Sequence, residues 1–172
     1  MRRRRFVADE NAWVSALVVQ SVASESGRWL LVLRRYLLMG APLHLLWEVA
    51  QLPLYTLWRE GTAGEIAFAV AHCTGGDVLI ATMSLVLALL LCGDREWPAR
   101  DFGSIVATTI LFGATYTIFS EWLNIEIRQS WAYAASMPTI PGIGTGLSPL
   151  AQWVIVPWIA FWWAARRTVV HW

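Results

Sequence analysis

Three side chains that could do chemistry stand in an otherwise apolar stretch, HLLWEVAQLPLY, which runs from His44 to Tyr55. Glu48 follows His44 by four residues and Gln51 follows it by seven, so a helix would carry all three on one face. An ionisable side chain inside a bilayer costs roughly 3 kcal/mol on insertion scales, which makes its position informative. The spacing predicts that these side chains turn toward a shared interior.

The second apolar stretch contains AHCTGGDV, which places His72 and Asp77 five residues apart. Gly75 and Gly76 lie between them and would permit a kink or a close helix approach. Either change would turn both ionisable side chains toward the same space. We therefore group them with the polar residues of the first stretch.

Two further apolar stretches bring polar and aromatic side chains to a similar depth, one ending in YTIFSEWLN and the other opening with SPLAQWVIVPW. If successive stretches are antiparallel helices that rise about 1.5 Å per residue, these side chains lie between mid-depth and the outer surface. The pattern predicts one polar pocket that opens outward. Its predicted catalytic residues are His44, Glu48, His72, Asp77 and Glu121, and its predicted substrate-binding residues are Trp47, Gln51, Tyr116, Asn124, Trp131, Gln152 and Trp153.

A purely structural role is the alternative for some of these residues. Gln51, Asn124 and Gln152 could serve as hydrogen-bonding links between helices, and Glu121 could extend to the membrane interface. Packing alone accounts poorly for two imidazoles and two carboxyl groups at similar depth, because burying them is costly.

The amino-acid composition indicates that these residues lie inside a membrane protein. Of the 172 residues, 57% are hydrophobic and 15% are charged, whereas about a quarter are charged in a typical soluble domain. Four stretches reach the roughly 20 apolar residues that a membrane span needs. The sequence therefore predicts an all-α integral membrane protein, a bundle of four transmembrane helices at about residues 36–58, 65–91, 102–123 and 147–165.

The remaining segments divide into two kinds. Residues 1–35, with a basic start, predict a cytoplasmic amphipathic segment on anionic lipid, which leaves 36–172 as the transmembrane domain. The connection over residues 124–148 is rich in proline, glycine and aromatic residues, which predicts an ordered cap at the outer surface.

Arginine alone supplies the 13 basic residues, and its distribution predicts the orientation. Seven arginines precede the first span, two lie between the second and third, and two follow the fourth, leaving Arg59 and Arg128 on the other side. By the positive-inside rule both termini are cytoplasmic, in the inner membrane if the host is bacterial. The short arginine clusters and a net charge of +1 give no reason to expect a nucleic-acid partner.

The stretches HLLWEVAQLPLY, YTIFSE and QWVIVP resemble corresponding stretches of the emopamil-binding protein family, the four-helix membrane bundles of the EXPERA group. The resemblance implies that His44 and Glu48 match the polar pair of the first helix in that family. Glu121 matches an acid of its catalytic region, and Trp153 matches the tryptophan that faces the substrate cation. The chain departs from the family pattern at AHCTGGD in the second span and at Leu150, where an asparagine would be expected.

The group includes sterol double-bond isomerases and sterol-binding receptors, so the resemblance implies acid–base chemistry on an isoprenoid or sterol-like lipid. A buried carboxylic acid would protonate a carbon–carbon double bond, and a second carboxylate or a histidine would remove a different proton. Aromatic faces from Trp47, Trp122, Trp131 and Trp153 would stabilise the carbocation. Isomerisation or cyclisation would follow without a cofactor, on a membrane lipid or another hydrophobic small molecule. A homodimer is an open alternative.

Rival interpretations use the same residues differently. His44, Glu48, His72, Asp77 and Glu121 could bind zinc or iron, and His44 with His72 could ligate a haem. No HExxH, Glu-x-x-His or CxxCH motif supports either site. A non-catalytic, lipid-binding accessory subunit is the third possibility.

Overall fold

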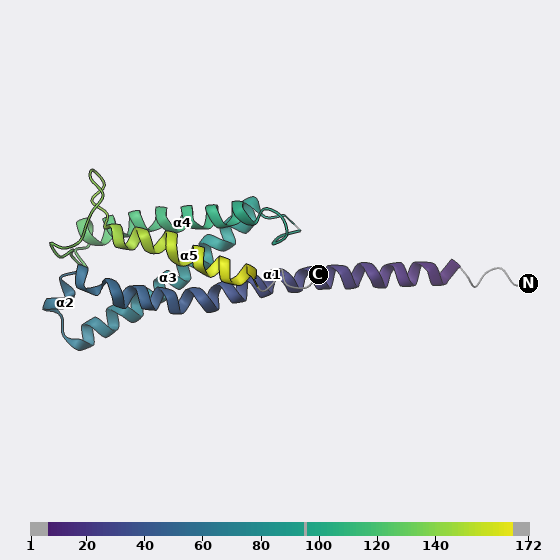
Figure 1. Cartoon of the computed structure of the whole chain (residues 1–172), viewed down its shortest axis with the longest axis horizontal. Coiled ribbons are helices and arrows are strands. Elements are labelled where there is room, and N and C mark those ends of the chain that lie inside the picture. The colour runs from purple at the N-terminus through teal and green to yellow at the C-terminus, as the bar shows by residue number, and fades with distance from the viewer. Residues whose placement is uncertain (1–6, 95, 167–172) are drawn as a thin grey trace, which may run out of the picture.

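The computed structural model describes residues 7–94 and 96–166, and within them every long element is an α-helix (Figure 1). Four helices contain apolar stretches long enough to cross a membrane. They are α1 (Val7–Gln51), α3 (Ala63–Cys92), α4 (Phe102–Trp122) and α5 (Leu147–Arg166). The prediction of an all-α membrane bundle of four spans is confirmed.

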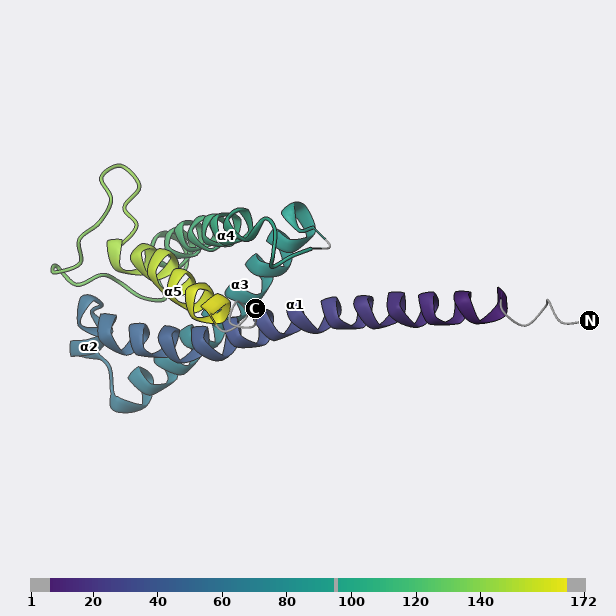
Figure 2. The ribbon, with the colours of Figure 1, turned by 45° about the vertical axis from the view of Figure 1, so that its right-hand side comes forward.

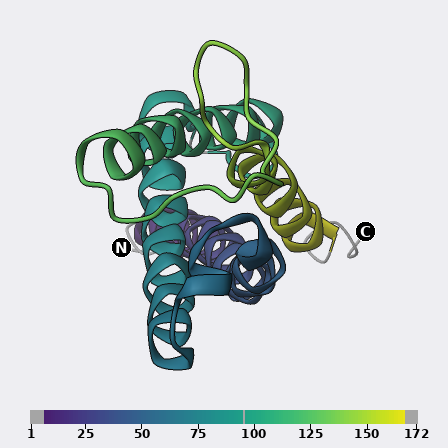
Figure 3. The same cartoon turned by 90° about the vertical axis from the view of Figure 1, so that its left-hand side faces the viewer.

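The four helices form a closed ring in which α1 packs against α3 and α5, and α4 packs against the same two helices. Viewed from the end, α3 crosses the direction of the other three helices, so that its first turns stand away from α4 and α5 (Figure 3). This arrangement sets α3 and α5 opposite each other, with the centre of the bundle between them.

The bundle divides along its length into an apolar half and a polar half. The hydrophobic core gathers where α1 and α3 pack against the start of α4 and the end of α5, around Tyr36, Leu85, Ile105 and Phe161. The rings of Tyr36 and Phe161 lie 4.3 Å apart at the centre of this half. The buried polar side chains of α1 begin two turns further along, at His44, so the apolar half anchors the helices that carry them.

The polar half ends in a corner between α1 and α3. A short 3-10 turn, η1 (Leu52–Leu54), contains Pro53, and the single helical turn α2 (Leu57–Glu60) follows. A capping box starts α3, because Thr62 and Glu65 each accept a hydrogen bond from the other's backbone N–H. The opposite corner is a π-helical turn, η2 (Leu123–Ile127), that continues α4.

The connection between η2 and α5 is an ordered cap over this end of the bundle. Its backbone bonds to the α1–α2 corner, with Thr56 N–H donating to Ala132 O at 3.0 Å and Ala134 N–H donating to Leu54 O at 2.9 Å. These bonds attach the cap to the polar half, as the proline- and glycine-rich composition predicts.

Helix α1 projects far beyond the bundle, from the end where α3 meets α4 and where α5 finishes (Figures 1 and 2). Its 45 residues make a rod of roughly 67 Å, against about 30 Å for the hydrocarbon core of a bilayer. Helix α1 runs unbroken through residue 35, where the sequence suggests the start of the transmembrane domain, and Val32 is fully buried in the core. Residues 1–6 of the predicted amphipathic segment lie outside the described residues.

Candidate active site

The side chain of Gln152 joins three helices at the centre of the bundle. From α5, its Nε2 donates to Asp77 Oδ2 on α3 at 2.7 Å and contacts His44 Nδ1 on α1 at 3.0 Å. His44 is only 1% exposed and Gln152 only 2%. Because α3 and α5 face each other across the ring, this amide connects helices that are not direct neighbours.

The amide determines which nitrogen of His44 carries the hydrogen. Both hydrogens of Gln152 Nε2 go to acceptors, so Nδ1 of the neutral imidazole is unprotonated and the ring hydrogen is on Nε2. Asp77 Oδ2 lies 3.5 Å from the same Nδ1 atom. If His44 takes up a proton, Asp77 is its counter-ion, so the pair can receive a proton and stabilise the resulting charge.

A second acid, Glu48, adjoins this pair one helical turn after His44. It is 9% exposed, accepts a hydrogen bond from Gln51 Nε2 at 2.8 Å, and lies within hydrogen-bonding reach of Asp77. The two carboxyl groups are therefore neighbours, and a proton carried by one would lie close to the other. Ser148 extends the network, because its Oγ donates to Gln51 Oε1 at 2.9 Å and accepts from Trp47 Nε1 at 3.2 Å.

Glu121 is the third buried acid, and the outer cap supplies its partner. The hydroxyl of Tyr133 donates to Glu121 Oε2 and accepts a hydrogen bond from Gly146 N–H at 2.8 Å. Burial first, and then the hydrogen bond to Glu121, raise the pKa of Tyr133 well above its usual value. The phenol therefore stays protonated as a donor to the acid. The ring of Tyr55, 5.5 Å from that of Tyr133, borders the same space.

Trp153 forms the aromatic wall of the cluster. It is 1% exposed, and its ring centre lies 5.4 Å from that of His44. On its other side α4 presents Gly113, where a Cβ atom would overlap the six-membered ring of Trp153. Helix α4 buries every fourth residue on this side, from Ile105 to Glu121, so the same face provides the glycine and the acid.

His72 does not join the other four predicted catalytic residues, which corrects the grouping made from the sequence. Its side chain is exposed and stacks on Phe68, with ring centres 5.6 Å apart. Five residues of regular helix separate His72 from Asp77 by about 140°. Helix α3 is continuous through Gly75 and Gly76, and nothing lies within 4 Å of a Cβ built on either glycine, so no close helix approach occurs there.

The remaining predicted binding residues fall into different places. Tyr116 is 48% exposed on the outside of α4, where it packs on Phe119. Asn124 is buried, but its amide donates to the backbone oxygen of Ser120 at 2.9 Å, which supports the π-helical turn. Trp122, expected to face a carbocation, is 49% exposed. The residues that do surround the acids are Trp47, Gln51, Trp131, Gln152 and Trp153.

The ligand geometry expected of a metal site is not found among the described residues, where no three His, Cys, Asp or Glu side chains are grouped to hold an ion. His44 is buried and hydrogen-bonded, whereas His72 is exposed on the far side of α3. The two imidazoles therefore do not flank a common space, as paired haem ligands would.

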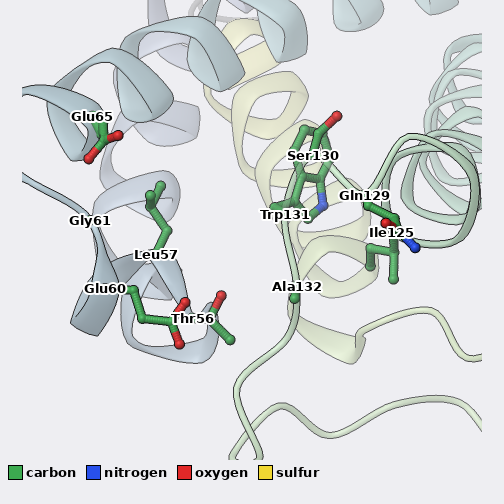
Figure 4. A pocket seen from close by; sticks show the side chains of 10 residues that line it. All are labelled: Thr56, Leu57, Glu60, Gly61, Glu65, Ile125, Gln129, Ser130, Trp131 and Ala132. Carbon is green, nitrogen blue, oxygen red and sulfur yellow. The ribbon is translucent and has the colours of Figure 1, made fainter.

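A groove of about 520 Å³ opens beside the cluster, at the capped end of the bundle (Figure 4). One side comes from α2 and the start of α3, and the other from the segment that follows α4. Its lining residues are Thr56, Leu57, Glu60, Gly61, Glu65, Ile125, Gln129, Ser130, Trp131 and Ala132. A smaller cavity of about 20 Å³ adjoins Glu121 and Tyr133. That volume is enough for a single water molecule.

Sequence reasoning missed three residues of the cluster, and spacing could have found two of them. Tyr55 follows Gln51 by four residues, and Ser148 precedes Gln152 by four, so each extends a face already recognised as polar. Tyr133 has no such signal, because the long connection that carries it has no helical period.

Comparison with models of known protein families, with curated proteins and with solved structures found no match to this chain.

Proposed function

We propose that the protein is a membrane enzyme that isomerises or cyclises an isoprenoid or sterol-like lipid by acid–base chemistry, through a carbocation. The resemblance to the emopamil-binding protein family is part of this proposal. The observation that carries it is that two acids and a base lie together: Asp77 shares the Gln152 amide with buried His44, and buried Glu48 lies beside Asp77.

The charge around this group supports proton transfer to carbon. Among the described residues no arginine forms an ion pair with Glu48, Asp77 or Glu121. A carboxylic acid without a nearby cation keeps its hydrogen in a medium of low dielectric, so it can act as an acid at neutral pH. A developing carbocation would also meet a second carboxylate and the face of Trp153.

The reaction needs only these groups. The electrons of the lipid double bond take the hydrogen of the Glu48–Asp77 pair, forming a C–H bond and leaving a carbocation at the neighbouring carbon. A carboxylate or His44 then removes a proton from another adjacent carbon, and its C–H electrons form the new double bond. For cyclisation, a second double bond of the same lipid attacks the cation before that proton leaves. In both cases the proton returns to the acid pair through the hydrogen-bonded group.

The proposal includes the location and orientation of the chain. The arginine distribution supports a bacterial inner membrane with both termini in the cytoplasm. The α1 projection, the α3–α4 connection and the end of α5 share one end of the bundle (Figure 1), which an even number of spans requires. The outer cap and the groove then face the periplasm.

Deuterium incorporation tests the proposal with a mixture of lipids, so the substrate need not be identified first. The purified protein is placed in nanodiscs that contain a mixed extract of unsaturated isoprenoid lipids, in D2O buffer. Protonation at carbon adds one non-exchangeable deuterium per turnover, which mass spectrometry of the extracted lipids detects. We expect labelled lipid with the wild-type protein and a loss of at least about 100-fold with Glu48→Gln or Asp77→Asn.

The matched control is Glu96→Gln, because Glu96 is an exposed acid at the other end of the bundle. It should label lipid at the wild-type rate. Equal labelling by the wild-type protein and Glu48→Gln, or no labelling by any of the proteins, would refute acid–base catalysis at this cluster.

A further inference from the structure

The groove beside the α1–α2 corner lies at the capped end of the bundle, and its lining residue Trp131 also lies near Glu121 of the acid cluster. Its two sides, shown in Figure 4, are the α2 corner with Thr56 and Glu60, and the segment with Ser130 and Trp131. It lies beyond the first apolar span, Trp29–Leu54, which comprises the second half of α1 and η1. This is the depth at which the polar end of a membrane lipid would sit.

We propose that this groove binds the head group of the substrate and that the head group is an uncharged hydroxyl rather than a phosphate. The inference rests on the proposed function for the identity of the reacting chain. It adds the polar end of the substrate and the residues that select it.

The charges of the lining residues support the choice of head group. Two carboxylates, Glu60 and Glu65, line the groove, and no arginine is among its described lining residues. Arg59 precedes Glu60 and Arg128 precedes the lining residue Gln129, but both arginines are exposed outside the lining. A phosphate would meet two like charges at this site, whereas a hydroxyl can both donate to a carboxylate and accept from a hydroxyl or amide.

Trp131 connects the groove to the acid cluster. It lines the groove, and its indole N–H is buried without a hydrogen-bond partner among the described residues. The same indole approaches the carboxyl group of Glu121, short of the geometry of a hydrogen bond. A hydroxyl seated beside this ring would direct the lipid chain past Glu121.

The length of α1 sets how far the reaction centre lies from the head group. Glu48 lies within α1, three residues before its end at Gln51, and η1 and Tyr55 separate that end from Thr56 in the groove. The double bond that reacts is therefore several carbon atoms from the hydroxyl, and the bond nearest the hydroxyl is not the one protonated.

A comparison of two ligands tests the head-group assignment. Binding of a C20 isoprenoid alcohol and of its monophosphate ester is measured by competition against the radiolabelled alcohol, with the full-length protein in phosphatidylcholine nanodiscs. We expect the alcohol to bind at least about tenfold more tightly than the monophosphate. The double variant Glu60→Gln/Glu65→Gln should reduce that preference to about threefold or less, and the control Glu96→Gln should leave it unchanged. Glutamine at residue 65 can still form the capping box, so the start of α3 is retained.

A second measurement uses only the wild-type protein, so it does not depend on the folding of a variant. The same alcohol, carrying a photoreactive diazirine next to the hydroxyl, should label peptides within residues 56–65 or 125–132. Tighter binding of the monophosphate, an unchanged preference in the double variant, labelling confined to other peptides, or no saturable binding of either ligand would each overturn the assignment.

These outcomes separate the two proposals. Binding with the expected preference but without deuterium incorporation would refute catalysis and leave the head-group site standing. Deuterium incorporation that depends on Glu48, without any preference for the alcohol, would refute the head-group site alone.

Discussion

Replacing Gly113 with alanine should destabilise the protein by forcing Trp153 away from α4. The added Cβ would overlap three atoms of the indole ring, which is 1% exposed and has its ring centre 5.4 Å from that of His44. Overpacking of this kind typically costs about 1–3 kcal/mol. Alanine also improves helix propensity over glycine by about 1 kcal/mol, which offsets part of that cost.

Gly75→Ala is the matched control, because Gly75 lies inside α3 with nothing within 4 Å of an added Cβ. The propensity gain is shared by the two variants, so Gly113→Ala should be less stable than Gly75→Ala by the overpacking cost alone, about 1–3 kcal/mol. The free energy of unfolding is measured by titration with denaturing detergent in mixed micelles, followed by circular dichroism. Equal stability of the two variants would show that Trp153 does not pack on Gly113.

Three further predictions concern the polar network. Gln152→Leu removes the hydrogen bonds of a buried amide and should lower the free energy of unfolding by about 2–5 kcal/mol. A double-mutant cycle with Asp77→Asn should give a coupling energy of at least about 1 kcal/mol. Additive effects of the two substitutions would contradict the contact between Gln152 and Asp77. Tyr133→Phe leaves Glu121 without its donor and should accelerate amide hydrogen exchange in the outer cap, so exchange at the wild-type rate would contradict that attachment. His72→Ala should leave deuterium incorporation within about twofold of wild type, because the His72 side chain is exposed away from the acids. A loss of activity as large as that of Asp77→Asn would show that His72 belongs to the catalytic site.

The sequence predicted the bundle well because the membrane limits the alternatives. Backbone polar groups must be satisfied within each span, so a long apolar stretch can only be a helix or a strand of a closed barrel. The helical spacing from His44 to Gln51 then identified the buried face of α1 correctly, since all three side chains lie inside the bundle. Periodicity was sufficient here because the first span is regular over its polar half.

Periodicity could not supply the parts of the site that depend on how helices cross. The grouping of His72 with Asp77 was wrong because depth in the membrane says nothing about direction around the helix axis. The two glycines of α3, Gly75 and Gly76, have no close neighbour. The glycine with a real packing role is Gly113, which had no polar neighbour to draw attention to it. Its role depends on a tryptophan forty residues later in the chain.

The crossing of α3 also explains why the polar side chains gather at one end of the bundle. Where α3 packs against α4, in the half with Leu85, the centre of the bundle is filled by apolar side chains. Toward its start α3 stands away from α4 and α5 (Figure 3), and at this end the outer cap is hydrogen-bonded to the α1–α2 corner. The acids stand at this transition, between a rigid apolar half that fixes their backbones and a polar end that opens to the groove. A site for a lipid needs both properties, because the reacting groups must be held in place while the ligand enters from the membrane.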